Sequence, residues 1–278
     1  MKKSIYPCLW FDGKAEEAAN FYCSIFNNSS INAITPLVVR MEIEGMQIMC
    51  LNGGPQFKIN PSISLFVNCT TIEETERIYT SLIDGGKALM PLDSYPWSQK
   101  YGWLQDKFGM TWQISVVQQP DMPFSIKPSM LFTASQFGRG EEAIQFYTSI
   151  FPNSSTDLLL HYDAENENAG KVLFSEFRIN NYPLTIMDGP GEHGYTFNEG
   201  VSFVIECETQ EEIDHYWSRL SEGGQEDRCG WLKDNYGVSW QVVPSILGKL
   251  MSDPEKAPKV IEAFMQMRKF DIEKLLQA

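Results

Sequence analysis

The chain has 278 residues, of which 43% are hydrophobic and 13% aromatic, and this composition is typical of a globular protein rather than a disordered one. Its formal net charge of −14 repels phosphate backbones and disfavours nucleic acid as a partner. No apolar run approaches the roughly 20 residues of a membrane span, and we recognise no signal peptide at the N-terminus. Six cysteines without a CxxC pair favour reduced thiols, so we expect a cytoplasmic protein and no membrane partner.

Hydrophobic spacing along the first half predicts strands and helices in alternation. An apolar run that ends at Asp12-Gly13 is typical of a strand and a turn, and the following segment has apolar residues at helical spacing. In chain order we expect a strand at 5–11, a helix at 14–26, strands at 34–44 and 46–51, a strand at 63–68, a helix at 71–83 and two or three more strands, the last at 111–117. This order indicates two similar units within the half.

The second half repeats the first. Residues 16–30, EEAANFYCSIFNNSS, and residues 141–155, EEAIQFYTSIFPNSS, are identical at 11 of 15 positions. GWLQDKFGMTWQ from Gly102 and GWLKDNYGVSWQ from Gly230 agree at 7 of 12 positions, and residues 64–87 align with 202–225 without a gap. Self-similarity of this kind indicates a tandem duplication.

The second copy should therefore contain the same elements. We expect a strand at 129–133, a helix at 141–151, strands at 172–179, 182–187 and 201–207, a helix at 210–220 and a strand at 239–243. The polar, proline-containing residues 118–123 predict a linker between the copies. Residues 244–278 have no counterpart in the first copy; their helical spacing predicts a helix that packs on or between the domains, with a partner-binding helix as the alternative.

Three blocks of the first copy resemble the PhnB-like family, which also carries the label 3-demethylubiquinone-9 3-methyltransferase. They are LWFDGKAEEAANFYCSIF from Leu9, ISLFVNCTTIEETERIYTSLIDGGKALMPL from Ile63 and GWLQDKFGMTWQIS from Gly102. The family belongs to the glyoxalase, bleomycin-resistance and extradiol-dioxygenase group, the vicinal oxygen chelate superfamily. Such a resemblance implies a fold rather than an activity, because this fold hosts many chemistries.

The resemblance implies an α+β protein with two tandem glyoxalase-like domains, at 1–118 and 126–243, and a C-terminal helical tail at 244–278. Each domain is expected to pair βαβββ modules so that a curved sheet surrounds a cavity and the helices lie outside.

Enzymes of this superfamily usually hold a divalent metal in the cavity through His, Glu or Gln on the first and last strands of each half. The last-strand position falls at Gln113 and Gln241. The other positions fall near residues 7–8, 49–51, 62–64, 128–129, 185–187 and 200–202, where this chain has no His, Asp or Glu. Three histidines in the whole chain are too few for two such sites, so we expect neither a catalytic metal nor another cofactor.

Alternation along the last strand of each copy separates two faces. Gln113 and Gln241 share the polar face, which should line the cavity, whereas Trp112 and Trp240 share the apolar face, which should pack under the helices. We therefore predict ligand contact for the two glutamines. A hydrogen bond to a neighbouring strand or to buried water is the alternative for each.

The remaining candidates for the cavity are two serines, four tryptophans and one histidine: Ser64, Ser202, Trp10, Trp97, Trp103, Trp231 and His193. The serines belong to the strand that opens the second half of each domain. Tryptophan offers a large contact area at low entropic cost, although a cavity wall is also its ordinary structural place. His193 lies in a glycine-rich loop and could act as acid, base or hydrogen-bond donor; an exposed loop histidine is the alternative.

Other polar positions have structural explanations, and we name no catalytic residue. Asp106 and Asp234 precede Gly109 and Gly237 at a spacing typical of a carboxylate that caps a turn. Isolated glycine pairs do not make the glycine-rich loop that binds S-adenosylmethionine, so the methyltransferase label finds no support in the residues. Cys229 follows Arg228, which could lower the pKa of its thiol, although an inert thiol is the alternative.

Two functions remain open at this stage. A protein that binds an unknown small molecule without a metal agrees with the missing ligands; a metal-dependent or acid/base lyase, isomerase or dioxygenase is the alternative. The duplication supplies an internal pseudo-dimer, which favours a monomer, while the C-terminal helices leave a homodimer open. The first copy alone has the loop LMPLDSYPWSQKY and the second alone has His193 and Cys229, so any divergence between the copies should lie there.

Overall fold

The computed structural model describes residues 5–117 and 122–278, which form four modules of the order β-α-β-β-β and a tail. Module 1 contains β1 (Ile5–Phe11), α1 (Ala15–Ile25), β2 (Ser29–Ile34), β3 (Val38–Ile43) and β4 (Met46–Asn52). Module 2 contains β5 (Ile63–Cys69), α2 (Ile72–Leu82), β6 (Lys87–Tyr95), β7 (Ser98–Gln105) and β8 (Thr111–Val116). Together these two modules are repeat 1.

Repeat 2 follows the same order. Module 3 contains β9 (Ser125–Phe132), the short helix η1 (Ala134–Gln136), α3 (Gly140–Ile150), β10 (Ser155–His161), β11 (Val172–Ile179) and β12 (Tyr182–Asp188). Module 4 contains β13 (Val201–Cys207), α4 (Gln210–Ser221), β14 (Gln225–Glu226), β15 (Trp231–Lys233) and β16 (Ser239–Pro244). The tail contains α5 (Leu247–Met251), α6 (Ala257–Met265) and α7 (Ile272–Gln277).

Four strands were not predicted from the sequence: β2, β10, β14 and β15. Strands β2 and β10 are sheet edges without a single buried residue, so they show no alternation of apolar and polar side chains. The predicted strand 34–44 therefore divides between the end of β2 and β3. Residues 118–121 of the predicted linker lie outside the described residues. In the two stretches that are described, no helix is long and apolar enough to cross a membrane.

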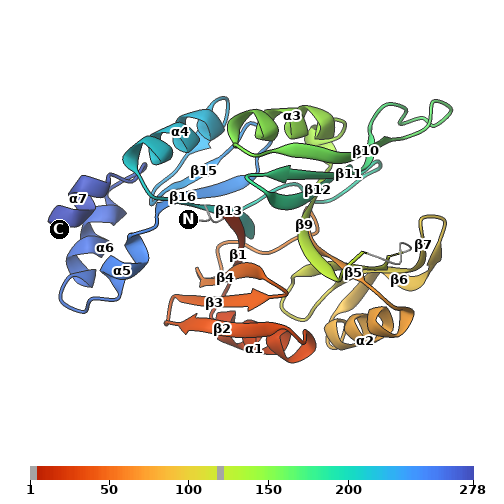
Figure 1. Ribbon diagram of the computed structural model, residues 1–278, viewed down its shortest axis with the longest axis horizontal. Coiled ribbons are helices and arrows are strands. Elements are labelled where there is room, and N and C mark those ends of the chain that lie inside the picture. Colours follow the sequence, from red (N-terminus) through yellow and green to blue (C-terminus); the bar gives the residue numbers. More distant parts are fainter. Residues whose placement is uncertain (1–4, 118–121) are drawn as a thin grey trace.

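Each β-sheet takes one module from each repeat (Figure 1). Sheet 1/4 has eight strands in the order β14-β15-β16-β13-β1-β4-β3-β2, and sheet 2/3 has eight in the order β10-β11-β12-β9-β5-β8-β7-β6. The repeats join where β1 runs antiparallel to β13 and where β5 runs antiparallel to β9. The βαβββ modules expected from the sequence are present in pairs, but the expected pairing within each domain is corrected: the two modules of a sheet come from different repeats.

The segments that connect the modules also cross between repeats. Asn60 Nδ2 donates to the carbonyl of Thr196 at 2.9 Å, and Asn198 Nδ2 donates to the carbonyl of Lys58 at 3.0 Å. A Cβ added at Gly200 would lie 2.6 Å from that Lys58 oxygen, so only glycine allows the segments to approach so closely. These reciprocal bonds join equivalent positions of the two repeats.

Within repeat 1, a buried aspartate joins the two modules on the helix side of the sheets. Tyr22 on α1 and the indole of Trp112 on β8 both donate to Asp106 Oδ2 at 2.8 Å. Asp106 Oδ1 accepts the backbone N–H groups of Phe108 and Met110 at 2.8 and 3.0 Å. The predicted turn cap is confirmed, and the same carboxylate also binds modules 1 and 2 together.

Repeat 2 has the same arrangement around Asp234, and we call each of these buried carboxylates with its four donors an aspartate node. Asp234 Oδ2 accepts from Tyr147 at 2.7 Å and from Trp240 at 2.8 Å, and Asp234 Oδ1 accepts from the backbone of Tyr236 and Val238. Both tryptophans are fully buried, as their place on the apolar face predicted. The node accounts for the Tyr, Asp and Trp positions at which the two copies are identical.

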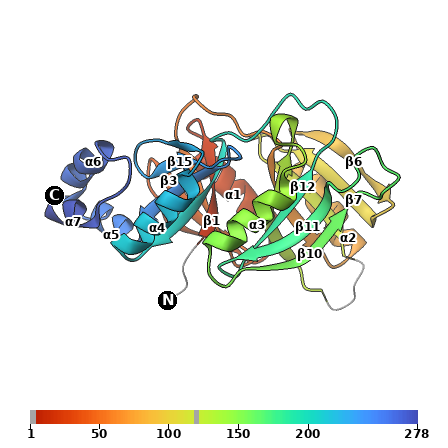
Figure 2. The same ribbon diagram turned by 90° about the horizontal axis from the view of Figure 1, so that it is seen from above.

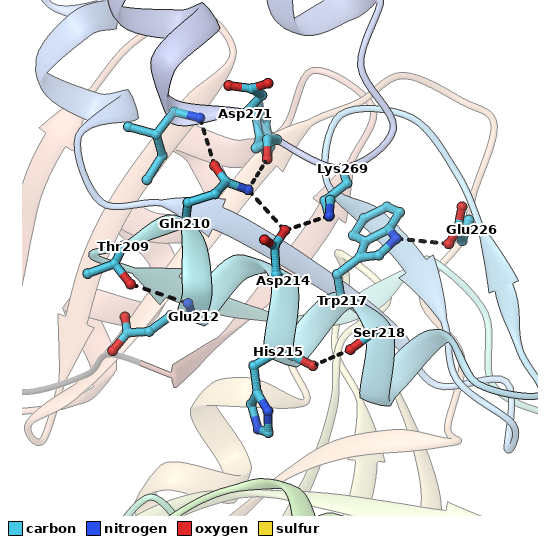
Figure 3. Close-up of polar contacts among 12 residues, drawn as sticks. Thr209, Gln210, Glu212, Asp214, His215, Trp217, Ser218, Glu226, Lys269 and Asp271 are labelled. Atoms are coloured by element: carbon cyan, nitrogen blue, oxygen red, sulfur yellow. Dashed lines mark hydrogen bonds and ion pairs between the residues drawn. The ribbon is translucent and has the colours of Figure 1, made fainter.

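The tail docks on α4 of module 4 (Figures 1 and 2). Gln210, at the start of α4, donates to the carbonyl of Phe270 at 3.1 Å and accepts the N–H of Ile272 at 2.9 Å. One turn later, Asp214 pairs with Lys269 (Figure 3). The predicted helix is thus a set of three short helices that packs on a domain.

The tail packs against a hairpin that is much shorter in repeat 2 than in repeat 1. In repeat 1, β6 and β7 form a long hairpin, whereas β14 has only 2 residues. The N–H groups of Cys229 and Gly230 donate instead to the carbonyls of Met267 and Arg268, each at 2.8 Å. Burial, and then the nearby Asp227, raise the pKa of the Cys229 thiol more than Arg228 lowers it, which agrees with an inert thiol.

The aspartate nodes make stability depend on pH. Burial raises the pKa of both Asp106 and Asp234 to about 6, against the four hydrogen bonds that each accepts. The folded state then holds the carboxyl protons more tightly than the unfolded chain does. The contribution of the two aspartates to the free energy of unfolding should therefore fall as pH rises from about 4 to about 6, and it should stay constant above pH 6.

Carbon-13 NMR of the aspartate carboxyls tests this expectation. Two carboxyl resonances should titrate near pH 6, while urea unfolding shows the free energy falling over the same interval. Ionisation of both carboxyls below pH 4 would contradict it, since the four donors would then outweigh burial.

Candidate functional site

Strand alternation places one set of side chains under the helices and another on the opposite face, which we call the inner face. Ile5 and Leu9 of β1 belong to the helix-side core. Tyr6 and Cys8, which alternate with them, form a separate buried cluster with Met49 and Val204. Each sheet therefore has an inner face built jointly by the two repeats.

The inner face of sheet 1/4 has a neutral polar centre. Cys8 lies opposite both Ser202 and Met49 in the strand register. Gln241 Nε2 donates to Ser202 Oγ at 3.0 Å. Burial raises the pKa of the Cys8 thiol to about 12, so the thiol keeps its proton at neutral pH and is no nucleophile.

The inner face of sheet 2/3 has a more extensive polar centre. Ser129 lies opposite Ser64 on one side and Thr185 on the other. Gln113 Nε2 donates to Ser64 Oγ at 2.7 Å and to Ser129 Oγ at 3.4 Å, and Tyr101 donates to Gln113 Oε1 at 2.8 Å. These bonds fix the orientation of the amide. For both glutamines the observed partner is a neighbouring strand, and contact with a ligand stays a prediction.

These residues lie within the ranges where the resemblance implied metal ligands: Cys8, Met49, Ser202 and Gln241 in one sheet, and Ser64, Gln113, Ser129 and Thr185 in the other. Divalent metals are held mainly by carboxylates, neutral imidazoles or thiolates, sometimes joined by an amide oxygen. At neutral pH these positions offer one glutamine amide in each sheet beside neutral hydroxyl, thiol and thioether groups, and the amide oxygen of Gln113 already accepts from Tyr101. Across residues 5–117 and 122–278, no three His, Cys, Asp or Glu side chains are placed to hold a metal ion. The donor set does not fit a catalytic divalent metal.

Three buried polar atoms on the inner faces have no hydrogen-bond partner among the described residues: Trp103 Nε1, Thr185 Oγ1 and Ser239 Oγ. Trp103 lies opposite Gln113 and Thr185 opposite Ser129, so two of the three belong to sheet 2/3. A buried polar atom without a partner costs about 1–3 kcal/mol, and a ligand atom that pairs with it recovers that energy.

An ion pair accompanies each polar centre, with the charges arranged differently. In sheet 1/4, Arg40 lies 3.3 Å from Glu206, which also accepts from the Tyr6 hydroxyl at 2.6 Å. In sheet 2/3, Lys127 on β9 pairs with Glu176 on β11. Arg40 and Glu176 lie at equivalent strand positions of the two repeats. Arg40 is opposite Met49, and Glu176 is opposite Thr185, which is the residue equivalent to Met49. The two faces therefore differ in charge pattern.

The predicted tryptophans divide between the two sheets. Trp10 and Trp231 come together across the repeats, with ring centroids 5.9 Å apart, at sheet 1/4. Trp103 lies on β7 in sheet 2/3, and Trp97 lies in the turn between β6 and β7. Trp97 is 58% exposed and stacks on Tyr95 at 5.0 Å, so it is a rim residue at most.

His193 is placed apart from both polar centres. It lies in the loop between β12 and β13, where its Nε2 is 3.1 Å from the carbonyl of Pro190 and its ring is 5.2 Å from that of Tyr195. These contacts are local to the loop, in which His193 is half-buried, and a contact of His193 with a ligand stays a prediction.

Several residues of the polar centre in sheet 2/3 were not among the candidates from sequence. Ser129 and Thr185 lie within the expected ligand positions, but a neutral hydroxyl in a strand carries no sequence signal that separates it from an ordinary strand residue. Tyr101 precedes Trp103 on the same face of β7, so strand alternation is the signal that could have found it. The pairing of Lys127 with Glu176 carries no sequence signal, because it depends on strand order.

Replacing Thr185 by Val tests whether its hydroxyl lacks a partner. The change keeps the shape and removes an unpaired buried oxygen, so the free energy of unfolding should rise by about 1 kcal/mol in urea denaturation. Ser175 is a matched control on the neighbouring strand, where its hydroxyl donates to the carbonyl of Ile186 at 2.8 Å. Ser175→Ala should lower stability by about 1 kcal/mol; loss of stability in Thr185→Val would contradict the assignment.

Comparison with known proteins agrees with this architecture. A sequence model of the family described as 3-demethylubiquinone-9 3-methyltransferase matches residues 3–115 and 125–243. Protein YjdN of Escherichia coli (strain K12) is 32% identical over 80 residues, which are 28% of this chain and 54% of that protein. The chain thus spans about half the length of this curated relative.

Two solved structures are among those that match the chain. A putative 3-demethylubiquinone-9 3-methyltransferase, PhnB protein, from Bacillus cereus is 38% identical, and the match covers 40% of this chain and 98% of that chain with a TM-score of 0.39. Glyoxalase I from Zea mays is 13% identical over 91% of this chain and 97% of that chain, with a TM-score of 0.54. The likeness to glyoxalase I shows the fold: tandem glyoxalase-like repeats, as the resemblance implied.

Proposed function

The chain belongs to the 3-demethylubiquinone-9 3-methyltransferase family, a PhnB-like family of the vicinal oxygen chelate superfamily, and from that premise we propose that it binds a small molecule on the inner face of sheet 2/3 without a catalytic metal. The observation that carries the proposal is the pair of buried, unpartnered atoms, Trp103 Nε1 and Thr185 Oγ1, beside the fixed amide of Gln113.

The surroundings of these atoms favour a ligand with a carbonyl or ether oxygen and a flat apolar part. Trp103 Nε1 is a donor only, so its partner must be an acceptor. Phe66 provides apolar contact area, and its ring lies 5.9 Å from Phe174 and 6.4 Å from Tyr101. Aromatic walls with a few placed polar atoms are typical of small-molecule sites.

The methyltransferase name of the family receives no support from the glycine pairs. A Cβ at Gly86 would lie 2.2 Å from the carbonyl oxygen of Gln105, and one at Gly224 would lie 2.1 Å from that of Lys233. Both glycines thus serve the close packing of a helix end on a strand. The thiol of Cys8 keeps its proton, and the carboxylates of Asp106 and Asp234 already accept four hydrogen bonds each. These groups therefore support binding rather than group transfer.

We propose further that the protein is a cytoplasmic monomer. A monomer with an internal pseudo-dimer is supported by the sheets, since each joins one module from either repeat. We place the protein in the cytoplasm, with a small molecule rather than nucleic acid or membrane as its partner, on the acidic charge of −14 and the cysteine pattern.

Native mass spectrometry and elemental analysis of the purified chain test the proposal. We expect one chain with a retained small molecule and no stoichiometric divalent metal. Trp103→Phe should weaken retention about five- to tenfold, because it removes one hydrogen bond and keeps the ring. Trp231→Phe, the matched change in sheet 1/4, should not. A stoichiometric metal, or equal retention in both variants, would contradict the proposal.

A further inference from the structure

Repeat 1 has a cavity that is distinct from the polar centres of both sheets. Its volume is about 730 Å³, within the range of small-molecule pockets. It is bounded by the end of β1 and the start of α1, by residues 55–59, by residues 85–87 and by residues 105–109. Among the predicted site residues, Trp10 lines it.

Three lysines of this cavity make no ion pair with any residue in 5–117 and 122–278: Lys58, Lys87 and Lys107. Lys107 Nζ lies instead 4.2 Å from the ring centroid of Phe21 and 5.3 Å from that of Phe108. In a chain with 36 acidic and 22 basic residues, the lining of this cavity has four lysines against three carboxylates and so a small positive excess. A concave surface with an excess of one sign of charge concentrates ligands of the opposite sign.

The carboxylates of the cavity offset its lysines only in part. Glu17 pairs with Lys14 at 2.6 Å, and Lys14 first and Lys107 after it hold the pKa of this carboxyl below its usual range. Asp106 is buried and faces the four donors of its node. Asp12 is the one lining carboxylate that has no partner among the described side chains, against three lysines.

Aromatic side chains supply the rest of the wall. Phe57 packs edge-on against Trp10 with ring centroids 4.9 Å apart, and Phe108 lies 6.4 Å from Phe11. A flat apolar ligand gains contact area here without ordering flexible side chains.

The equivalent positions of repeat 2 lack the lysines. The alignment and the reciprocal Asn60 and Asn198 bonds place Thr196 at the position of Lys58, Gln225 at that of Lys87 and Asn235 at that of Lys107. Cations that do occur nearby are paired, Arg139 with Glu142 and Lys233 with Glu199, each at 2.8 Å. The positive cavity is therefore a property of these side chains and is not imposed by the fold.

We propose that this cavity binds an organic anion with an aromatic body, whose carboxylate or phosphate group lies against the three lysines while its ring packs on Phe57 and Phe108. This site is separate from the one on sheet 2/3, and either can exist without the other.

Calorimetric titration of the full chain tests the site with 2-naphthoate and 2-naphthyl phosphate, and with neutral 2-naphthamide and inorganic phosphate as controls. At least one naphthyl anion should bind one equivalent at least about tenfold more tightly than either control, and the stronger anion identifies the preferred headgroup. Added salt should weaken this binding. Naphthamide binding as tightly as both anions would overturn the proposal.

The matched triple variant Lys58→Thr, Lys87→Gln and Lys107→Asn copies repeat 2 and should weaken anion binding by about tenfold or more. Trp103→Phe should leave it unchanged, so failure here is separable from failure of the site on sheet 2/3. If the triple variant does not fold, the reverse variant Thr196→Lys, Gln225→Lys and Asn235→Lys tests whether the same lysines create an anion site in repeat 2. A second bound equivalent supports the proposal, and its absence contradicts it.

Discussion

The carboxylates of Asp106 and Asp234 connect modules that no sheet connects. Each carboxylate is shared by a helix of one module and a strand of the next within the same repeat. The sheets make the other two connections, module 4 to module 1 and module 2 to module 3. Aspartate nodes and sheets thus alternate around a closed ring of four modules. Because a buried charged hydrogen bond is among the stronger polar interactions, breaking a node should affect modules beyond it.

This ring explains why the inner faces are shared by the repeats. The centre of sheet 2/3 takes Ser64 and Gln113 from repeat 1 and Ser129 and Thr185 from repeat 2. Neither repeat has a complete inner face of its own. The two faces can differ even though the repeats are similar, because each face combines different modules. The unpartnered Trp103 and Thr185 on one side, and the protonated Cys8 on the other, are the result.

Most of the fold could be predicted from sequence, because repeated blocks and alternation identify the modules and their central strands. Edge strands such as β10 could not, since an exposed strand has no apolar periodicity. The sequence also did not predict which two modules share a sheet, because strand order depends on contacts between distant residues. For the site, alternation correctly assigned Gln113 to the face opposite Trp112, but the pairing of Lys127 with Glu176 and the orphaned Thr185 hydroxyl required the structure.

Native-state hydrogen exchange of Tyr147→Phe tests the closed ring most directly. The change removes one donor from Asp234 and should lower the free energy of opening by about 1.5–3 kcal/mol. If the ring unfolds as one unit, the slowest amides of β5 in repeat 1 and of β13 in repeat 2 lose protection by the same amount. Loss of protection confined to modules 3 and 4, with β5 unchanged, would contradict the account.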